Sequence, residues 1–141
     1  SCDIRLASEK STFAIPAAKL GLAYDYLGIK RLREIVGPAR AKYIFYTARQ
    51  FSSDEALKIG IIEEVFKNDS FSKDIMSVLN SINDNAPLTI SSAKLAIDAD
   101  PFDDKIFKKC KELERICFSS KDYEEGRLAF SEKRKPIFKG H

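Results

Sequence analysis

An aspartate between two tyrosines is the first feature of this sequence that could do chemistry. Asp25 stands between Tyr24 and Tyr26 in the stretch FAIPAAKLGLAYDYLGIKRL, residues 13–32. A carboxylate beside aromatic rings in a partly apolar pocket is suited to exchange a proton with carbon. The same carboxylate is suited to cap the helix that we expect to begin near Tyr26. Both interpretations of Asp25 stay open on the sequence.

A basic cluster close to the C-terminus is the second candidate. Lys133, Arg134 and Lys135 are consecutive, and Lys139 follows. A flexible ammonium group suits a polyanionic ligand. Alternatively, the cluster is a solvated helix end, where cations complement the helix dipole. Phe130, just before the cluster, either lines a ligand pocket or packs in a core.

The elements that position Asp25 begin with two strand-like runs, residues 4–7 and 12–15, around a polar turn. Two strands alone make no stable sheet, so we expect them to pair with strands outside this chain or to dock on the following helices. A helical period starts at Tyr26 and is broken by Gly37-Pro38. Ser52 and Glu55 have the spacing of a capping box, in a helix that Gly60 ends. A strand is predicted over residues 61–66.

The chain after residue 69 is predicted to be nearly all helical. Helices are expected over about 70–82, 88–99, 102–118 and 119–135, separated at Pro87 and Pro101 and ended by Pro136. We therefore predict two parts, residues 1–69 and 70–141. The apolar stripes of the second part exceed what these helices can hide among themselves, so we expect them to pack on another domain or subunit.

Composition sets outer limits on the function. The 141 residues carry a net charge of +3, and 44% of them are hydrophobic. No apolar run approaches the roughly 20 residues of a membrane span, and the mild charge does not favour nucleic acid. Three cysteines are an odd number, which argues against a disulfide framework and for a reducing compartment. We predict a cytoplasmic protein with no membrane, nucleic-acid or metal site.

Seven motifs in one register carry a resemblance to a known family. They are CDIRLA (residues 2–7), FAIP with LGL (13–22), GIKRL (28–32), VGPARA (36–41), FSSDEA with GII (51–62), NAP (85–87) and FSEKRKPIF (130–138). Together they resemble the enoyl-CoA hydratase/isomerase, or crotonase, superfamily. The resemblance implies an α/β fold: the C-terminal part of a ββα spiral, followed by a helical trimerisation region.

The resemblance also implies a function. The expected protein is the C-terminal portion of an acyl-CoA enzyme, a lyase or isomerase of fatty acid metabolism that stabilises a thioester enolate. It needs no cofactor beyond the coenzyme A thioester that is its substrate, and it forms a homotrimer or a dimer of trimers. The family's oxyanion loop and first catalytic glutamate lie upstream of the matched part, so we expect this chain alone to be inactive.

Two positions decide which chemistry the resemblance implies. Ala17 stands where the family's P-E motif has its second hydratase glutamate. A methyl group cannot move a proton, which puts the two-glutamate hydration in doubt. Asp25 matches an aspartate of dienoyl-CoA isomerase-like members, and Lys133 aligns with a lysine that approaches the CoA phosphates. The expected site is thus Asp25 as the catalytic residue, with Tyr24, Tyr26, Phe130 and Lys133 binding substrate; the alternative is a non-catalytic assembly module.

Overall fold

The computed structural model describes residues 2–100 and 102–141, and the break predicted at Pro101 lies outside them. The chain forms two compact units, Ser1–Ile75 and Met76–His141, and each is described here by itself. Helix α4 (Phe71–Asn83) belongs to both. The division predicted between residues 69 and 70 stays a prediction.

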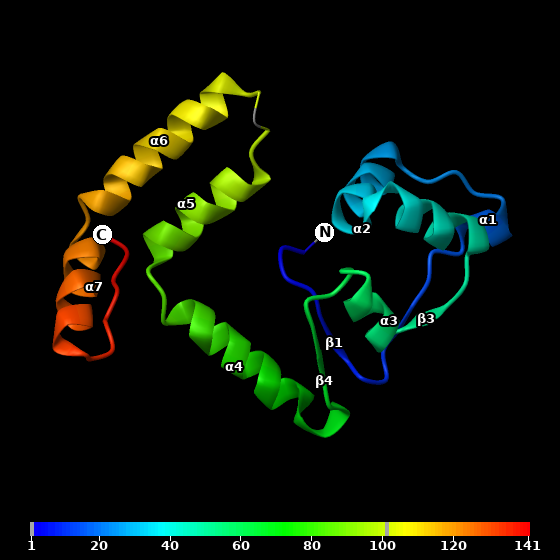
Figure 1. Ribbon diagram of the computed structural model, residues 1–141, viewed down its shortest axis with the longest axis horizontal. Coiled ribbons are helices and arrows are strands. Elements are labelled where there is room, and N and C mark those ends of the chain that lie inside the picture. Colours follow the sequence, from blue (N-terminus) through cyan, green and yellow to red (C-terminus); the bar gives the residue numbers. More distant parts are fainter. Residues whose placement is uncertain (1, 101) are drawn as a thin grey trace. The chain divides into compact units, whose positions relative to one another are not determined.

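Short strands frame the first unit (Figure 1). Strand β1 (Leu6–Ser8) pairs in parallel with β4 (Glu64–Phe66), and β2 (Thr12–Phe13) pairs antiparallel with β3 (Phe51–Ser52). We expected partners outside the chain or docking on the following helices; β2 does contact helix α3 (Ser53–Lys58), but pairing within the chain was not foreseen. Their partners come later in the same chain, and strand propensity carries no information about a partner so distant in sequence.

A long broken helix, α2 (Tyr26–Thr47), crosses the first unit after the short helix α1 (Ala17–Leu20). The break predicted at Gly37-Pro38 is confirmed, because Gly37 leaves the helical region with φ 78° and ψ 163°. Glycine has no Cβ and adopts this conformation without steric cost. The change of direction lets the second half of α2 bury Ala41 and Ile44.

The capping box of helix α3 (Ser53–Lys58) is confirmed in full. The Ser52 hydroxyl accepts from the Glu55 N–H, and the Glu55 carboxylate accepts from the Ser52 N–H. Gly60 follows the helix with φ 77°, as the sequence predicted. Capping ties α3 to β3, so that both contribute to one core. The buried residues of that core are Ala7, Val36, Ala41, Ile44, Phe51, Ala56 and Ile62.

The second unit is helical. Helix α5 (Pro87–Asp98) packs against α6 (Asp104–Phe118), which contacts α7 (Lys121–Glu132). Side-chain caps begin α6 and α7: Asp103 accepts from the N–H groups of Lys105 and Ile106, and Ser120 accepts from that of Tyr123. No helix among the described residues is long and apolar enough to cross a membrane.

The predicted end of the last helix is wrong. Helix α7 stops at Glu132, and Lys133 adopts the left-handed conformation, instead of continuing to Pro136. The Arg134 N–H turns back to the Ala129 carbonyl at 3.0 Å. The hydrogen bonds of this turn therefore end the helix before the chain reaches Pro136.

Candidate functional site

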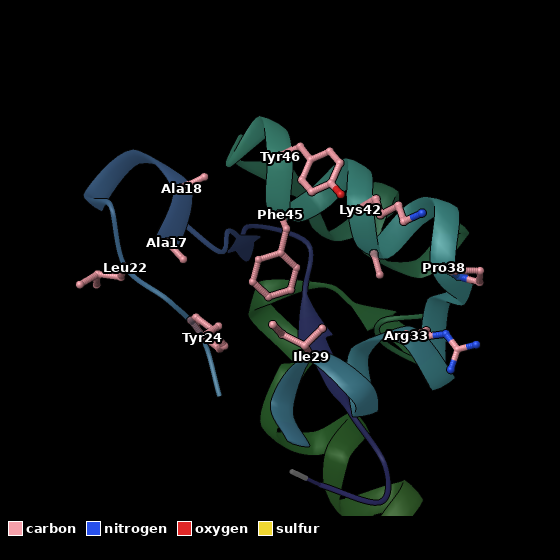
Figure 2. Close-up of a pocket in the computed structure, with 11 residues that line it drawn as sticks. Ala17, Ala18, Leu22, Tyr24, Ile29, Arg33, Pro38, Lys42, Phe45 and Tyr46 are labelled. Carbon is pink, nitrogen blue, oxygen red and sulfur yellow. The ribbon is translucent and has the colours of Figure 1, made fainter. Parts of the chain in front are cut away.

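An apolar pocket of ≈ 700 Å³ is the main hollow of the first unit. Helix α1, the loop after it and both halves of α2 form its walls. Figure 2 shows Phe45 near its centre, with Ile29 below it and the loop residues Leu22 and Tyr24 on one side. The lining residues are Ala17, Ala18, Leu22, Tyr24, Ile29, Arg33, Pro38, Ala41, Lys42, Phe45 and Tyr46.

Ala17 gives this pocket a methyl group in its wall. It is the first residue of α1, directly after Pro16, and only 4% of its surface is exposed. The turn and the helix start would aim a longer side chain at this position into the same hollow. The position that the resemblance assigns to a glutamate is thus part of the pocket, but it carries no acid.

The two tyrosines beside Asp25 differ in their surroundings. Tyr24 lines the pocket and meets Phe45 edge-on, with 5.4 Å between the ring centroids. Tyr26 is 74% exposed and lies outside the pocket lining. Only Tyr24, therefore, is placed to touch a ligand held in this pocket.

Asp25 caps helix α2. Its Oδ2 accepts a hydrogen bond from the Gly28 N–H at 2.9 Å. The carboxylate is exposed and follows directly on the pocket residue Tyr24. The capping interpretation is therefore observed. A cap engages one carboxylate oxygen, so the acid–base interpretation stays a prediction.

Two cations line the Pro38 end of the pocket. Arg33 comes from the first half of α2 and Lys42 from the second (Figure 2). Within residues 2–100 and 102–141, neither side chain forms an ion pair. An otherwise apolar hollow thus carries positive charge at one end, a feature that the sequence analysis missed. Helical spacing assigns residues 33 and 42 to ordinary solvent-facing positions, so nothing in the sequence indicated that they line a pocket.

Phe130 lies in a second hollow of ≈ 690 Å³, within the second unit. Residues of α5, α6, α7 and the C-terminal segment line it, including Ala93, Tyr123 and Phe138. The Phe130 side chain is 87% exposed. Packing of this ring in the core of the unit is therefore excluded, and its predicted role in substrate binding is untested.

Two cations of the terminal cluster, Lys133 and Lys139, form no ion pair among the described residues. Arg134 pairs with Glu125 and Glu132, and Lys135 pairs with Asp84. The hydrogen bond from Arg134 and a second from the Ile137 N–H lower the pKa of Glu125 to about 2. Lys133 was singled out by resemblance alone, and the carboxylates that pair with Arg134 and Lys135 were missed.

Comparison with known proteins identifies the family. The profile of the enoyl-CoA hydratase/isomerase family matches residues 1–141. The chain belongs to this family. Its relatives include a short-chain-enoyl-CoA hydratase of Clostridium acetobutylicum, 35% identical over 96% of this chain and 52% of the relative. A methylmalonyl-CoA decarboxylase of Escherichia coli is 31% identical over 100% of this chain and 56% of the relative.

Solved structures of family members confirm the fold. A crystal structure of an enoyl-CoA hydratase/isomerase family member superposes with a TM-score of 0.90 at 29% identity, over 98% of this chain and 52% of the other. The enoyl-CoA hydratase of Bacillus anthracis gives 0.85 at 30% identity, over 99% and 55%. The predicted crotonase-like α/β fold is thus confirmed. The chain spans about half the length of these proteins.

Proposed function

We propose that this chain is the C-terminal portion of an acyl-CoA enzyme that works through a thioester enolate. The family membership supports acyl-CoA as the substrate class. The observation that carries the proposal is the apolar pocket beside Asp25, whose wall has the methyl of Ala17 in place of an acid. A pocket of this size and character suits an acyl group.

The residues that line the pocket argue against hydration by two acids. Hydration needs one group to activate water and another to deliver a proton to carbon. Ala17 offers neither. Two acids are next in sequence to a pocket-lining residue, Asp25 and Glu34, and Glu34 forms an ion pair with Arg31, so Asp25 is the better candidate. Asp25 would therefore take the proton from the carbon alpha to the thioester and return it, as a double-bond shift requires. Tyr24 would contact the acyl group in this pocket. The substrate contacts predicted for Tyr26, Phe130 and Lys133 involve residues outside the pocket lining and stay predictions.

Decarboxylation is a second candidate, favoured by Ala17 together with Arg33 and Lys42. When a malonyl-type thioester loses CO₂, the electrons of the breaking carbon–carbon bond form the enolate, so no base is needed. An apolar wall disfavours the ionised carboxylate and favours its departure. The positive charges of Arg33 and Lys42 would attract an anionic acyl group. The relative in Escherichia coli that is named a methylmalonyl-CoA decarboxylase fits this chemistry.

Exchange of the alpha protons of an acyl-CoA with D₂O tests enolate formation directly. The complete protein is incubated with a saturated acyl-CoA, and NMR follows the loss of the alpha-proton signal. The variant Asp25→Asn keeps a capping oxygen but loses the base. If Asp25 is the base, exchange falls by about 100-fold or more. Asp54→Asn, in the first turn of α3 and outside the pocket, is the matched control.

The outcomes separate the candidates. Exchange that survives in Asp25→Asn removes the catalytic role of Asp25. Release of CO₂ from a methylmalonyl thioester, undiminished in Asp25→Asn but reduced in Arg33→Gln and Lys42→Gln, supports decarboxylation instead. A complete protein that binds no acyl-CoA at high micromolar concentration is the non-catalytic assembly module, and the enzyme proposal then fails.

A further inference from the structure

A smaller hollow of ≈ 330 Å³ lies in the first unit, and it has no lining residue in common with the apolar pocket described above. The second half of α2, strand β3 and helix α3 form its walls, together with the link between α2 and β3. None of its residues was predicted from the sequence to belong to a site. The lining residues are Arg40, Tyr43, Ile44, Arg49, Phe51, Glu55, Lys58 and Ile59.

One wall of this hollow is fixed by the pairing of Arg49 with Glu55. Two nitrogens of the Arg49 guanidinium donate to the two carboxylate oxygens of Glu55, at 2.7 and 3.2 Å. The same guanidinium lies over the Tyr43 ring, with 5.4 Å between its carbon and the ring centroid. Glu55 is held in turn by the capping box, through the Ser52 N–H at 3.3 Å. Bidentate pairs are geometrically specific, so this wall is preorganised.

The backbone directly before Arg49 has an uncommon conformation. Ala48 ends α2 in the left-handed region, with φ 45° and ψ 30°. A residue with a Cβ reaches this region at a steric cost that glycine avoids. Such strain is a reason to look for a role of the segment that it positions. Here the segment begins with Arg49, which lines the hollow.

The charges around the hollow do not cancel. Among the described residues that line it, the acidic one is Glu55, and Arg49 engages both of its oxygens. Arg40 and Lys58 form no ion pair in the part of the chain that the structure describes. Three cations against one carboxylate leave an excess of two positive charges at this hollow.

The size and walls of the hollow define the kind of anion that fits. The other four lining residues, Tyr43, Ile44, Phe51 and Ile59, are aromatic or aliphatic. An inorganic ion is much smaller than the hollow and would leave these walls uncovered. A phosphate monoester carries nearly two negative charges at neutral pH, because its second pKa is about 6. Its charge therefore matches the excess of two, and its organic group would cover the apolar wall.

We propose that this hollow binds a small phosphate monoester with a compact organic group, through Arg40, Arg49 and Lys58. The site lies outside the apolar pocket and does not rest on the proposed acyl-CoA chemistry. A phosphate held by Arg40 and Lys58 connects the second half of α2 to the last turn of α3. A ligand that binds the folded state in this way also stabilises it.

Phenyl phosphate and phenyl sulfate test the proposal on the complete protein. The two esters are close in shape, but at about pH 7.5 the sulfate carries one negative charge and the phosphate nearly two. Calorimetry measures both Kd values in the presence of excess CoA, which occupies any phosphate site that belongs to CoA. We expect a Kd of roughly 1 mM or lower for phenyl phosphate. Phenyl sulfate should bind severalfold more weakly.

Two single variants locate the binding. Arg40→Gln and Lys58→Gln should each weaken the binding of phenyl phosphate about tenfold, as for loss of one charged contact. Lys30→Gln, in the first half of α2 and outside the hollow, is the matched control and should leave the Kd unchanged. Lys58 also complements the dipole at the end of α3. A loss of stability in Lys58→Gln alone is therefore no support, and the Kd decides.

Equal affinities for the two esters would overturn the proposal, as would a Kd that neither Arg40→Gln nor Lys58→Gln changes. Phenyl phosphate that binds only without CoA occupies the substrate site, so this proposal then fails while the proposed function stands. Conversely, a protein that binds phenyl phosphate through Arg40 and Lys58 but binds no acyl-CoA keeps this site, and the proposed function fails.

Discussion

At the scale of single residues, Asp25 shows how one side chain can stabilise the fold and also lie next to the candidate site. Its carboxylate caps α2, and α2 supplies most of the pocket wall, including Ile29 and Phe45. Any substitution that removes the cap therefore changes the pocket as well as the acid. Loss of activity in Asp25→Ala would for this reason not distinguish the two roles.

The cap can be measured separately. We expect Asp25→Ala to lower the free energy of unfolding by about 1 kcal/mol, because the Gly28 N–H loses its acceptor. Asp25→Asn keeps an acceptor oxygen and should cost only a few tenths of a kcal/mol. Urea denaturation of the complete protein measures both. Equal losses for Ala and Asn would show that the charge, and not the cap, stabilises the helix.

Sequence reasoning worked at residues whose partners are close in the chain. Ser52 and Glu55 are three positions apart, and the capping box that they form was predicted and observed. Lys133 is the opposite case. Its left-handed backbone follows from Arg134 folding back onto Glu125, nine positions earlier. The helix propensity of lysine favours a continued helix at position 133, so the local sequence predicted the wrong backbone conformation there.

At the scale of elements, helix α7 and the segment after it, residues 133–141, form one acid-sensitive assembly. The hydrogen bond from Arg134, helped by the Ile137 N–H, lowers the pKa of Glu125 from its ordinary value of 4.5 to about 2. A lowered pKa in the folded state means that the ionised form stabilises the fold. That stabilisation is complete above about pH 4.5 and is lost as the pH falls towards 2.

Glu125→Gln should remove this part of the pH dependence. The difference in stability between the wild type and Glu125→Gln is expected to be largest at neutral pH and to shrink as the pH falls from 4.5 to 2. Denaturation curves at steps of half a pH unit provide the measurement, with Glu114→Gln as a control on α6. A difference that stays constant over this range would contradict the assigned pKa.

The elements also show where sequence reasoning stops. The helices of the second unit were predicted from breaks that lie in the sequence itself, such as Pro87 and Pro101. Strands β1, β2 and β4 were predicted in place but not in pairing, and β3 was not predicted. Leu6 lies beside Glu64 and Phe13 beside Phe51, and no local pattern in either strand names its partner.

At the scale of the whole molecule, the chain exposes large apolar side chains on both units. Leu22 is 61% exposed in the first unit, while Ile97, at 82%, and Phe102, at 93%, belong to the second. Isolated exposed apolar residues are ordinary, but a large number of them indicates surfaces that another domain or subunit covers. The predicted trimer is one such arrangement, and it stays a proposal.

Residues 1–141 expressed on their own should reveal these surfaces. We expect them to associate in light scattering and to enhance the fluorescence of a hydrophobic dye, whereas the complete protein should be a discrete oligomer with little dye binding. The charge-neutral variant Phe107→Ser, on α6, should reduce the association of the isolated residues. A monodisperse monomer that binds no dye would contradict the expectation.

The pairing of β1 with β4 has a consequence for synthesis. Leu6 meets Glu64 in a parallel ladder, so β1 lacks this partner until the chain has been made through Phe66. At about 5–20 residues per second, that interval lasts roughly 3–12 seconds. During it, the edge of β1 that later pairs with β4 is open to chaperones. Slow codons between positions 8 and 66 should lengthen this exposure, and fast ones should shorten it.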